Sequence, residues 1–227
     1  MIRDDPRLRD RAPVFADRVE AGRALARLLA TQRAGGALVL AIPCGGVPVA
    51  LELARALALE LDVAPVSKVL LPWTTEAGFG AVAFDGSVWV NEDDVLHYGL
   101  KKAAVEKAVS EARAKVARRL KILRGDRPLP ELAGRTVILV DDGIAAGSTM
   151  RAAIAALRRL QATKIIVAVP TGHRRAAELV AGLADEVYCA NLRGATRFAV
   201  ADAYEEWRDV SDTEAEALLG APTKGKP

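Results

Sequence analysis

Hydrophobic positions along the chain form two kinds of pattern. In the first, four to nine mostly apolar residues follow one another directly, which is typical of strands buried on both faces of a sheet. In the second, apolar residues recur every three to four positions, as they do on one side of an amphipathic helix. The short runs lie at 37–42, 63–71, 136–140, 164–169 and 186–190, and the helical patterns at 18–33, 48–60, about 101–123, 148 to about 160 and about 173–182. Strands and helices alternate, so we expect an α/β fold, a parallel sheet with helices on both faces.

One segment departs from this alternation. Residues 72–80 (PWTTEAGFG) have no periodicity and contain one proline and two glycines, which predicts a loop. The runs 81–84 and 87–91 flank Asp85-Gly86, a strong hairpin signal. We therefore expect an inserted hairpin and lid at about 72–91 in a single domain spanning 1–227, with a frayed tail at about 220–227.

Composition narrows the classes of protein that remain. Of the 227 residues, 51% are hydrophobic and only 4% aromatic, which argues against a single-strand nucleic-acid binder built on stacking rings. Cys44 and Cys189 lie far apart without metal-ligand spacing, so we expect neither a disulfide framework nor a zinc site. The charged N-terminus and the lack of a long apolar run predict a cytoplasmic protein without a membrane partner.

The string VILVDDGIAAGSTM at 137–150 carries the strongest candidate chemistry. Its apolar run delivers Asp141 and Asp142 to the carboxyl end of a buried strand, where open α/β sheets bind ligands. Small residues follow, and then Ser148 and Thr149 at the start of a helix. Free backbone N–H groups and the helix dipole favour a phosphate there. A ribose 5-phosphate, with vicinal hydroxyls near its phosphate, would satisfy both halves.

Other interpretations of this string fit less well. A Walker A loop needs a lysine before the hydroxyl residue, but Gly147 stands there, and no GxGxxG motif occurs. A receiver domain would place its acid pair near the start of the domain. The pair could also merely cap a helix, but the coincidence of strand, acids, small residues and hydroxyls favours a binding site.

VILVDDGIAAGST resembles the phosphoribosyl pyrophosphate motif of type I phosphoribosyltransferases, in particular a branch of uncharacterised, predicted phosphoribosyltransferases. The resemblance extends over roughly residues 17–212. It implies that Asp141 and Asp142 hold the ribose 2- and 3-hydroxyls and take part in binding Mg²⁺. The residues that it implies for the 5-phosphate are Ala145, Ala146, Gly147, Ser148 and Thr149.

Two upstream segments resemble further parts of this family. Cys44, Gly45 and Gly46 follow the first strand like the pyrophosphate loop, where the branch commonly reads Pro-Arg-Gly-Gly. Lys68 resembles the lysine of an Arg-Lys pair, although Ser67 replaces the arginine. Both departures reduce the positive charge available to pyrophosphate. Cys44 is either a reactive thiol beside a helix N-terminus or, as we favour, a small residue that fits the turn.

The predicted lid and the motif loop bear on the acceptor. Glu76 is the candidate general base in the lid, and Trp73 and Phe79 either stack on an acceptor ring or pack against the body. Purine-salvage members of the family carry an Asp where this chain has Ala145. We therefore do not expect a 6-oxopurine acceptor handled by such an Asp.

Residues 101–124 contain nine basic side chains against two acidic ones. Nucleic-acid binding would be one interpretation, but the whole chain carries only +3, so we favour a solvated helix face.

The resemblance as a whole implies an enzyme of the pentosyl glycosyltransferase class. It would transfer a 5-phosphoribosyl group from phosphoribosyl pyrophosphate to a small acceptor, such as a nitrogenous base, and release pyrophosphate. It also implies Mg²⁺ as cofactor and a homodimer, with no nucleic-acid partner expected. The alternative is a non-catalytic regulator that senses the same donor or a nucleotide and that could also bind nucleic acid. Cys44, Ser67 and Ala145 favour this alternative, because all three depart from the residues of catalytic members.

Overall fold

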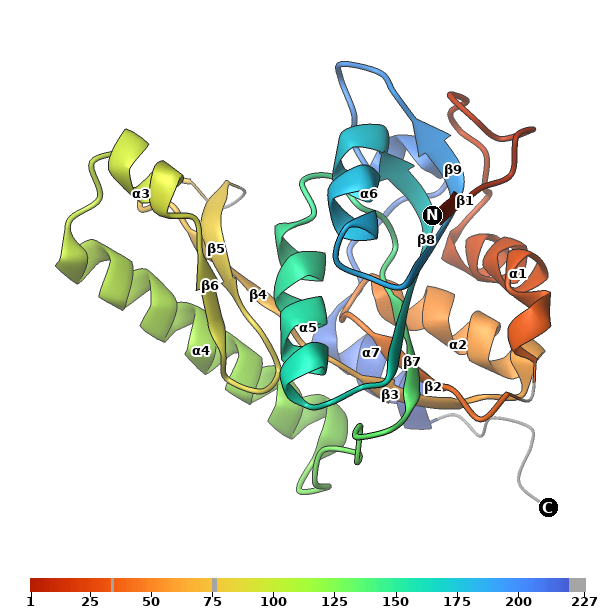
Figure 1. Ribbon diagram of the computed structural model, residues 1–227, viewed down its shortest axis with the longest axis horizontal. Helices are drawn as coiled ribbons and strands as arrows, with labels where there is room; N and C mark the ends of the chain where they lie inside the picture. The colour runs from red at the N-terminus through yellow and green to blue at the C-terminus, as the bar shows by residue number, and fades with distance from the viewer. Residues whose placement is uncertain (34, 75–76, 221–227) are drawn as a thin grey trace.

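The computed structural model describes residues 1–33, 35–74 and 77–220, and its centre is a six-stranded sheet (Figure 1). The strands follow the order β1-β9-β8-β7-β2-β3, and every neighbouring pair is parallel. They are β1 (Ile2–Arg3), β2 (Leu38–Ala41), β3 (Glu60–Val63), β7 (Thr136–Val140), β8 (Lys164–His173) and β9 (Glu186–Arg193). The fold is therefore the α/β parallel sheet that the apolar runs predict.

Helices cover both faces of this sheet. On one face lie α1 (Arg18–Leu28), α2 (Gly46–Leu57) and α7 (Asp212–Gly220), and on the other lie α5 (Ser148–Arg159) and α6 (Arg174–Ala181). Along β7, Ile138 and Val140 pack toward the first group and Val137 and Leu139 toward the second, because successive side chains of a strand point to opposite faces. No helix in the described part of the chain is long and apolar enough to span a membrane.

A second, smaller sheet lies beside α5 and forms a separate layer with two helices (Figure 1). It is antiparallel and consists of β4 (Ser67–Leu70), β5 (Gly78–Val82) and β6 (Val88–Val90), followed by α3 (Glu92–His97) and α4 (Lys102–Arg124). Val69, Phe79 and Val116 are buried where this sheet meets α4. The predicted hairpin around Asp85-Gly86 is thus confirmed as β5–β6.

The predicted strand at 63–71 is wrong as a single element. It divides into the end of β3 and the whole of β4, which belong to different sheets. Pro65 lies between them and has no N–H to donate to a ladder. The predicted loop at 72–80 is also shorter, because β5 already begins at Gly78, where it pairs with β4. Glu76 lies outside the described residues.

Other predicted boundaries shift for local reasons. The first helix ends at Leu28, after which a short 3-10 turn (Ala30–Gln32) follows, and the second begins at Gly46 rather than at 48. Strand β8 continues through Pro170, beyond its predicted end at 169. The proline is tolerated because β7 has already ended opposite Ala168.

The chain reverses its direction of travel across the sheet between β2 and β7. From β2 the chain moves to β3 on one side, whereas from β7 it moves to β8 and β9 on the other. The loops that leave the carboxyl ends of β2 and β7 therefore diverge at neighbouring positions. This is the switch point at which open α/β sheets bind their ligands.

We predict that Leu139→Ala lowers the free energy of unfolding by about 2–5 kcal/mol, because Leu139 is fully buried in the central strand and its truncation leaves a cavity. The matched control is Leu179→Ala on α6, where the leucine is 57% exposed and the expected loss is about 0.5 kcal/mol or less. Urea denaturation measures both values, and equal losses in the two variants would contradict this packing of β7.

Candidate functional site

The loops after β2 and β7 touch at the switch point, and two glycines make this contact possible. Asp141 and Asp142 follow β7 directly. A Cβ on Gly45 would overlap the carboxylate of Asp142, and one on Gly46 would lie 2.8 Å from the carbonyl oxygen of Val140. The peptide bond between Pro43 and Cys44, in the same loop, is cis. Any side chain at Gly45 or Gly46 would therefore push the acid pair out of position.

The remainder of the β7–α5 loop is fixed by β8. The N–H of Ile144 donates to the carbonyl of Thr171 at 3.0 Å, and the N–H of His173 donates to the carbonyl of Ile144 at 2.9 Å. Gly147 then adopts a φ of +81° just before α5, a conformation that glycine takes without steric cost. The loop thus reaches the first turn of α5 with its backbone held on both sides.

A cavity of about 200 Å³, here called the loop cavity, is formed by this segment. Its lining contains the five residues predicted to bind a phosphate, together with Lys68 from β4 and Asp141. The full lining is Lys68, Asp141, Gly143, Ile144, Ala145, Ala146, Gly147, Ser148, Thr149, Met150 and Val200. The first N–H groups of α5 lack partners within the helix, and the helix dipole adds a partial positive charge there. The structure therefore brings the predicted anion cradle and one carboxylate of the pair together.

A second cavity of about 230 Å³, here called the basic cavity, shares Lys68, Asp141 and Thr149 with the first. Its other side is formed by the β2–α2 loop, by β4 and by two cations of α4, Lys115 and Arg119. Part of the basic helix therefore lines a cavity, while Lys115 and most other basic side chains of the helix are exposed, as expected for a solvated face. Lys68 lines both cavities.

Asp142 is held by Tyr204 and by Arg18, of which sequence analysis did not single out Arg18. Its Oδ2 accepts hydrogen bonds from Nε and Nη2 of Arg18 at 3.0 and 2.9 Å, and its carbonyl accepts one from the Tyr204 hydroxyl at 2.6 Å. The guanidinium of Arg18 also donates to the carbonyl of Arg208 at 2.8 Å and lies 3.8 Å from the centre of the Trp207 ring. Arg18 is only 7% exposed, although its helical pattern placed arginines on the outer face. Contacts across 124 and 190 positions of the chain, with Asp142 and Arg208, account for its burial.

The electrostatics of the two carboxylates differ from those of surface acids. Burial, and next the negative charge of Asp142, raise the pKa of Asp141 well above its ordinary value. Burial also raises the pKa of Asp142, although the charge of Arg18 and its hydrogen bonds oppose the shift. Further hydrogen-bond donors or cations would therefore stabilise the ionised pair, and a bound diol or metal ion would supply them.

Cys44 does not behave as a reactive thiol. It is buried, and its Sγ donates a hydrogen bond to Oδ1 of Asp212 at 2.9 Å. Burial, together with this hydrogen bond, raises the pKa of Cys44 to about 12, so the thiol stays protonated at neutral pH. The interpretation of Cys44 as a small residue that fits the turn accounts for the structure, and the reactive-thiol alternative is wrong. Helix α7, which supplies Asp212, was not predicted.

The two aromatic side chains considered for acceptor stacking lie elsewhere. Phe79 is 1% exposed and packs in the core of the small sheet. Trp73 is exposed, and its ring packs edge-on against Tyr98 with 5.8 Å between ring centres. Neither ring lines the loop cavity or the basic cavity, so no acceptor platform is formed by them in this structure.

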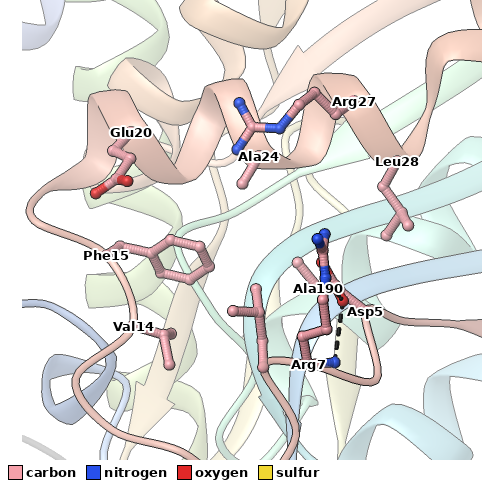
Figure 2. A pocket seen from close by; sticks show the side chains of 10 residues that line it. Asp5, Arg7, Val14, Phe15, Glu20, Ala24, Arg27, Leu28 and Ala190 are labelled. Carbon is pink, nitrogen blue, oxygen red and sulfur yellow. Dashed lines mark hydrogen bonds and ion pairs between the residues drawn. The ribbon is translucent and has the colours of Figure 1, made fainter.

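Another cavity, of about 320 Å³, lies between the N-terminal segment and α1 (Figure 2). Its apolar lining includes Val14 and Phe15, and Arg7 forms an ion pair with Asp5 at its edge. The four charged lining residues are Asp5, Arg7, Glu20 and Arg27, two of each sign. Because these charges balance, and no lining residue is shared with the other two cavities, nothing here selects a phosphate.

We predict that Asp141→Asn stabilises the fold at neutral pH. A carboxyl group whose pKa is raised by folding binds more protons in the folded state than in the unfolded state. The stability of the wild type therefore falls as the pH rises from 3.8, the ordinary pKa of an aspartate, through the raised pKa of Asp141. The gain in free energy of unfolding of Asp141→Asn should be fully present above the raised pKa and should disappear below pH 3.8. Urea denaturation between about pH 3 and 8 measures it.

The control for this prediction is Asp93→Asn, at an exposed position of α3. A variant Asp141→Asn that is less stable than wild type at neutral pH, or a gain shared by Asp93→Asn, would contradict the electrostatic cost assigned to Asp141.

Comparison with known proteins identifies the family. A family model described as the phosphoribosyl transferase domain matches residues 17–203. Two strains of Mycobacterium tuberculosis each contain a curated protein, assigned by name as a phosphoribosyl transferase, that is 39% identical over 206 residues. These residues make up 91% of this chain and 46% of the relative, so the chain spans about half the length of the curated relatives it matches.

A solved structure supports the same assignment. The crystal structure of the protein TT1426 from Thermus thermophilus is 34% identical, with a TM-score of 0.75, over 91% of this chain and 97% of that one. Since the family model spans the whole region from α1 to the end of β9 and beyond, the chain belongs to the phosphoribosyl transferase family, with an α/β fold of the type I kind.

Proposed function

We propose that the protein transfers the 5-phosphoribosyl group of phosphoribosyl pyrophosphate to a small nitrogenous acceptor and releases pyrophosphate. The observation that carries this proposal is the arrangement of two cavities around one carboxylate. Asp141, together with Lys68 and Thr149, borders both the loop cavity and the basic cavity. A ligand with a phosphate at one end, a diol in the middle and a second anion at the other end would satisfy all three features.

The chemistry follows from the same groups. The loop from Ala145 to Thr149 would bind the 5-phosphate through backbone N–H groups and hydroxyls. Asp141 and Asp142 would accept hydrogen bonds from the ribose hydroxyls, which lowers the cost of keeping these carboxylates ionised. As the acceptor nitrogen bonds to C1, the C1–O bond breaks, its electron pair leaves with pyrophosphate and the acceptor releases a proton. Negative charge near the ribose would stabilise the cationic character that develops at C1.

Mg²⁺ fits this site as part of a ligand complex. In the described part of the chain, no three His, Cys, Asp or Glu side chains gather as a metal cage. Mg²⁺ often binds through one or two carboxylates and completes its shell with water and substrate oxygens, and Asp141 and Asp142 supply that number. When bound, the ion would neutralise phosphate charge, while Arg18 keeps Asp142 in place. Glu76 stays a prediction as the general base, and homodimerisation stays an expectation from the resemblance.

We predict that the protein binds phosphoribosyl pyrophosphate with Mg²⁺ and that Asp141→Asn/Asp142→Asn weakens this binding by about 10–100-fold, the value of one or two hydrogen bonds to charged acceptors. Isothermal titration calorimetry measures both affinities. Asp93→Asn is the matched control and should bind like wild type. A double variant that binds equally well, or a wild type that does not bind, would contradict the assignment of the site.

Turnover is tested separately by pyrophosphate release in a screen of nitrogenous acceptors. Because Ala145 offers no carboxylate to a base, we expect 6-oxopurines to be poor acceptors. Donor binding without pyrophosphate release from any acceptor would favour the sensor alternative.

A further inference from the structure

The β2–α2 loop and the start of β4 together carry little positive charge. Cys44 is neutral because its pKa is about 12, and Ser67 is buried and uncharged. Lys68 alone is a cation among residues 42–46 and 66–70. If a diphosphate binds beside this loop, any cationic side chains besides Lys68 come from another part of the fold.

Helix α4 supplies them. Lys115 and Arg119 are four residues apart, so they lie on the same side of the helix, and both line the basic cavity. Nη1 of Arg119 donates to the carbonyl of Pro43 at 3.3 Å, which places the guanidinium directly against the β2–α2 loop. Nε of the same side chain donates to Oδ1 of Asp212 at 3.0 Å. Arg119 is therefore fixed in position rather than extended into solvent.

The charge balance of the basic cavity favours an anion. Its lining contains three cations, Lys68, Lys115 and Arg119, and one carboxylate, Asp141. Partial desolvation lowers the pKa of Lys115, and the nearby charges of Arg119 and Arg118 act in the same direction. Asp212 offsets part of this charge by pairing with Arg119. An anion in the cavity would offset the rest.

We infer that Lys115 and Arg119 bind the diphosphate of the donor and stabilise the charge that gathers on it as the C1–O bond breaks. Asp212 is then a positioning residue, because it touches Arg119 and Cys44 rather than the cavity. The inference rests on the proposed function and assigns its diphosphate subsite to a helix outside the sequence motifs. The donor would be held from three directions, by the loop cavity, by the acid pair and by α4.

The test compares Lys115→Ala/Arg119→Ala with Lys107→Ala/Arg113→Ala, a pair that removes the same charge from exposed positions of the same helix. Calorimetry is done with three ligands in the presence of Mg²⁺: phosphoribosyl pyrophosphate, inorganic pyrophosphate and ribose 5-phosphate. We expect Lys115→Ala/Arg119→Ala to bind the first two about 10–100-fold more weakly and ribose 5-phosphate unchanged. The control pair should bind all three like wild type.

The outcomes separate this inference from the proposed function. A wild type that binds neither phosphoribosyl pyrophosphate nor ribose 5-phosphate overturns the proposed function and the inference together. If Lys115→Ala/Arg119→Ala binds the donor as tightly as wild type, this result overturns the α4 subsite alone. Equal weakening by the control pair would show a general charge effect and would also overturn it.

Single variants guard against misfolding, because Arg119 also contacts Pro43 and Asp212. Lys115→Ala, at a position without these contacts, should still weaken pyrophosphate binding, and Arg119→Lys should restore part of the affinity lost in Arg119→Ala. The dependence of pyrophosphate affinity on salt should also be less steep in Lys115→Ala than in wild type. Unchanged affinity in a folded Lys115→Ala, with an unchanged salt dependence, would count against the inference.

Discussion

The close approach of two loops at the β2–β7 edge is the constraint on which the site depends. Gly45 and Gly46 allow the first loop to lie against Asp141 and Asp142 at distances that no Cβ would permit. Because β2 and β7 are neighbouring parallel strands, this contact places the acid pair between the two helix N-termini of α2 and α5. Anion cradles and carboxylates can then act on one ligand, although phosphate and carboxylate repel each other when no diol or cation lies between them.

This arrangement has an energetic cost that other parts of the fold offset. The acid pair is half-buried, and both of its pKa values are raised. Arg18 compensates Asp142 through two hydrogen bonds, and the segment after β9 covers Arg18 with the Trp207 ring and the carbonyl of Arg208. Arg18 donates these hydrogen bonds to Asp142 and not to Asp141. The pKa of Asp141 is raised, so a ligand that donates hydrogen bonds or carries positive charge can stabilise its ionised form. Sites prepared for binding often retain destabilising charge of this kind.

The small sheet and α4 complete the site from the other side. Lys68 belongs to β4, and Lys115 and Arg119 come from α4, so the basic cavity lies where this layer meets the main sheet. The helix α7 joins the same region, because Asp212 contacts both Arg119 and Cys44. The layer of the small sheet and α4 therefore does more than cover the site, because it contributes positive charge that the strand–loop motifs lack.

Local patterns in the sequence were enough to predict the parallel sheet, the hairpin and the loop from Asp141 to Thr149, because periodicity, turn residues and helix starts act over a few neighbouring residues. The break at Pro65 and the helices α3 and α7 were missed, whereas the partners of the acid pair were decided only by tertiary structure. Arg18 meets Asp142 across 124 positions, and Cys44 meets Asp212 across 168. Such pairs leave no periodic trace, because burial and ion pairing depend on which distant segments the folded chain brings together.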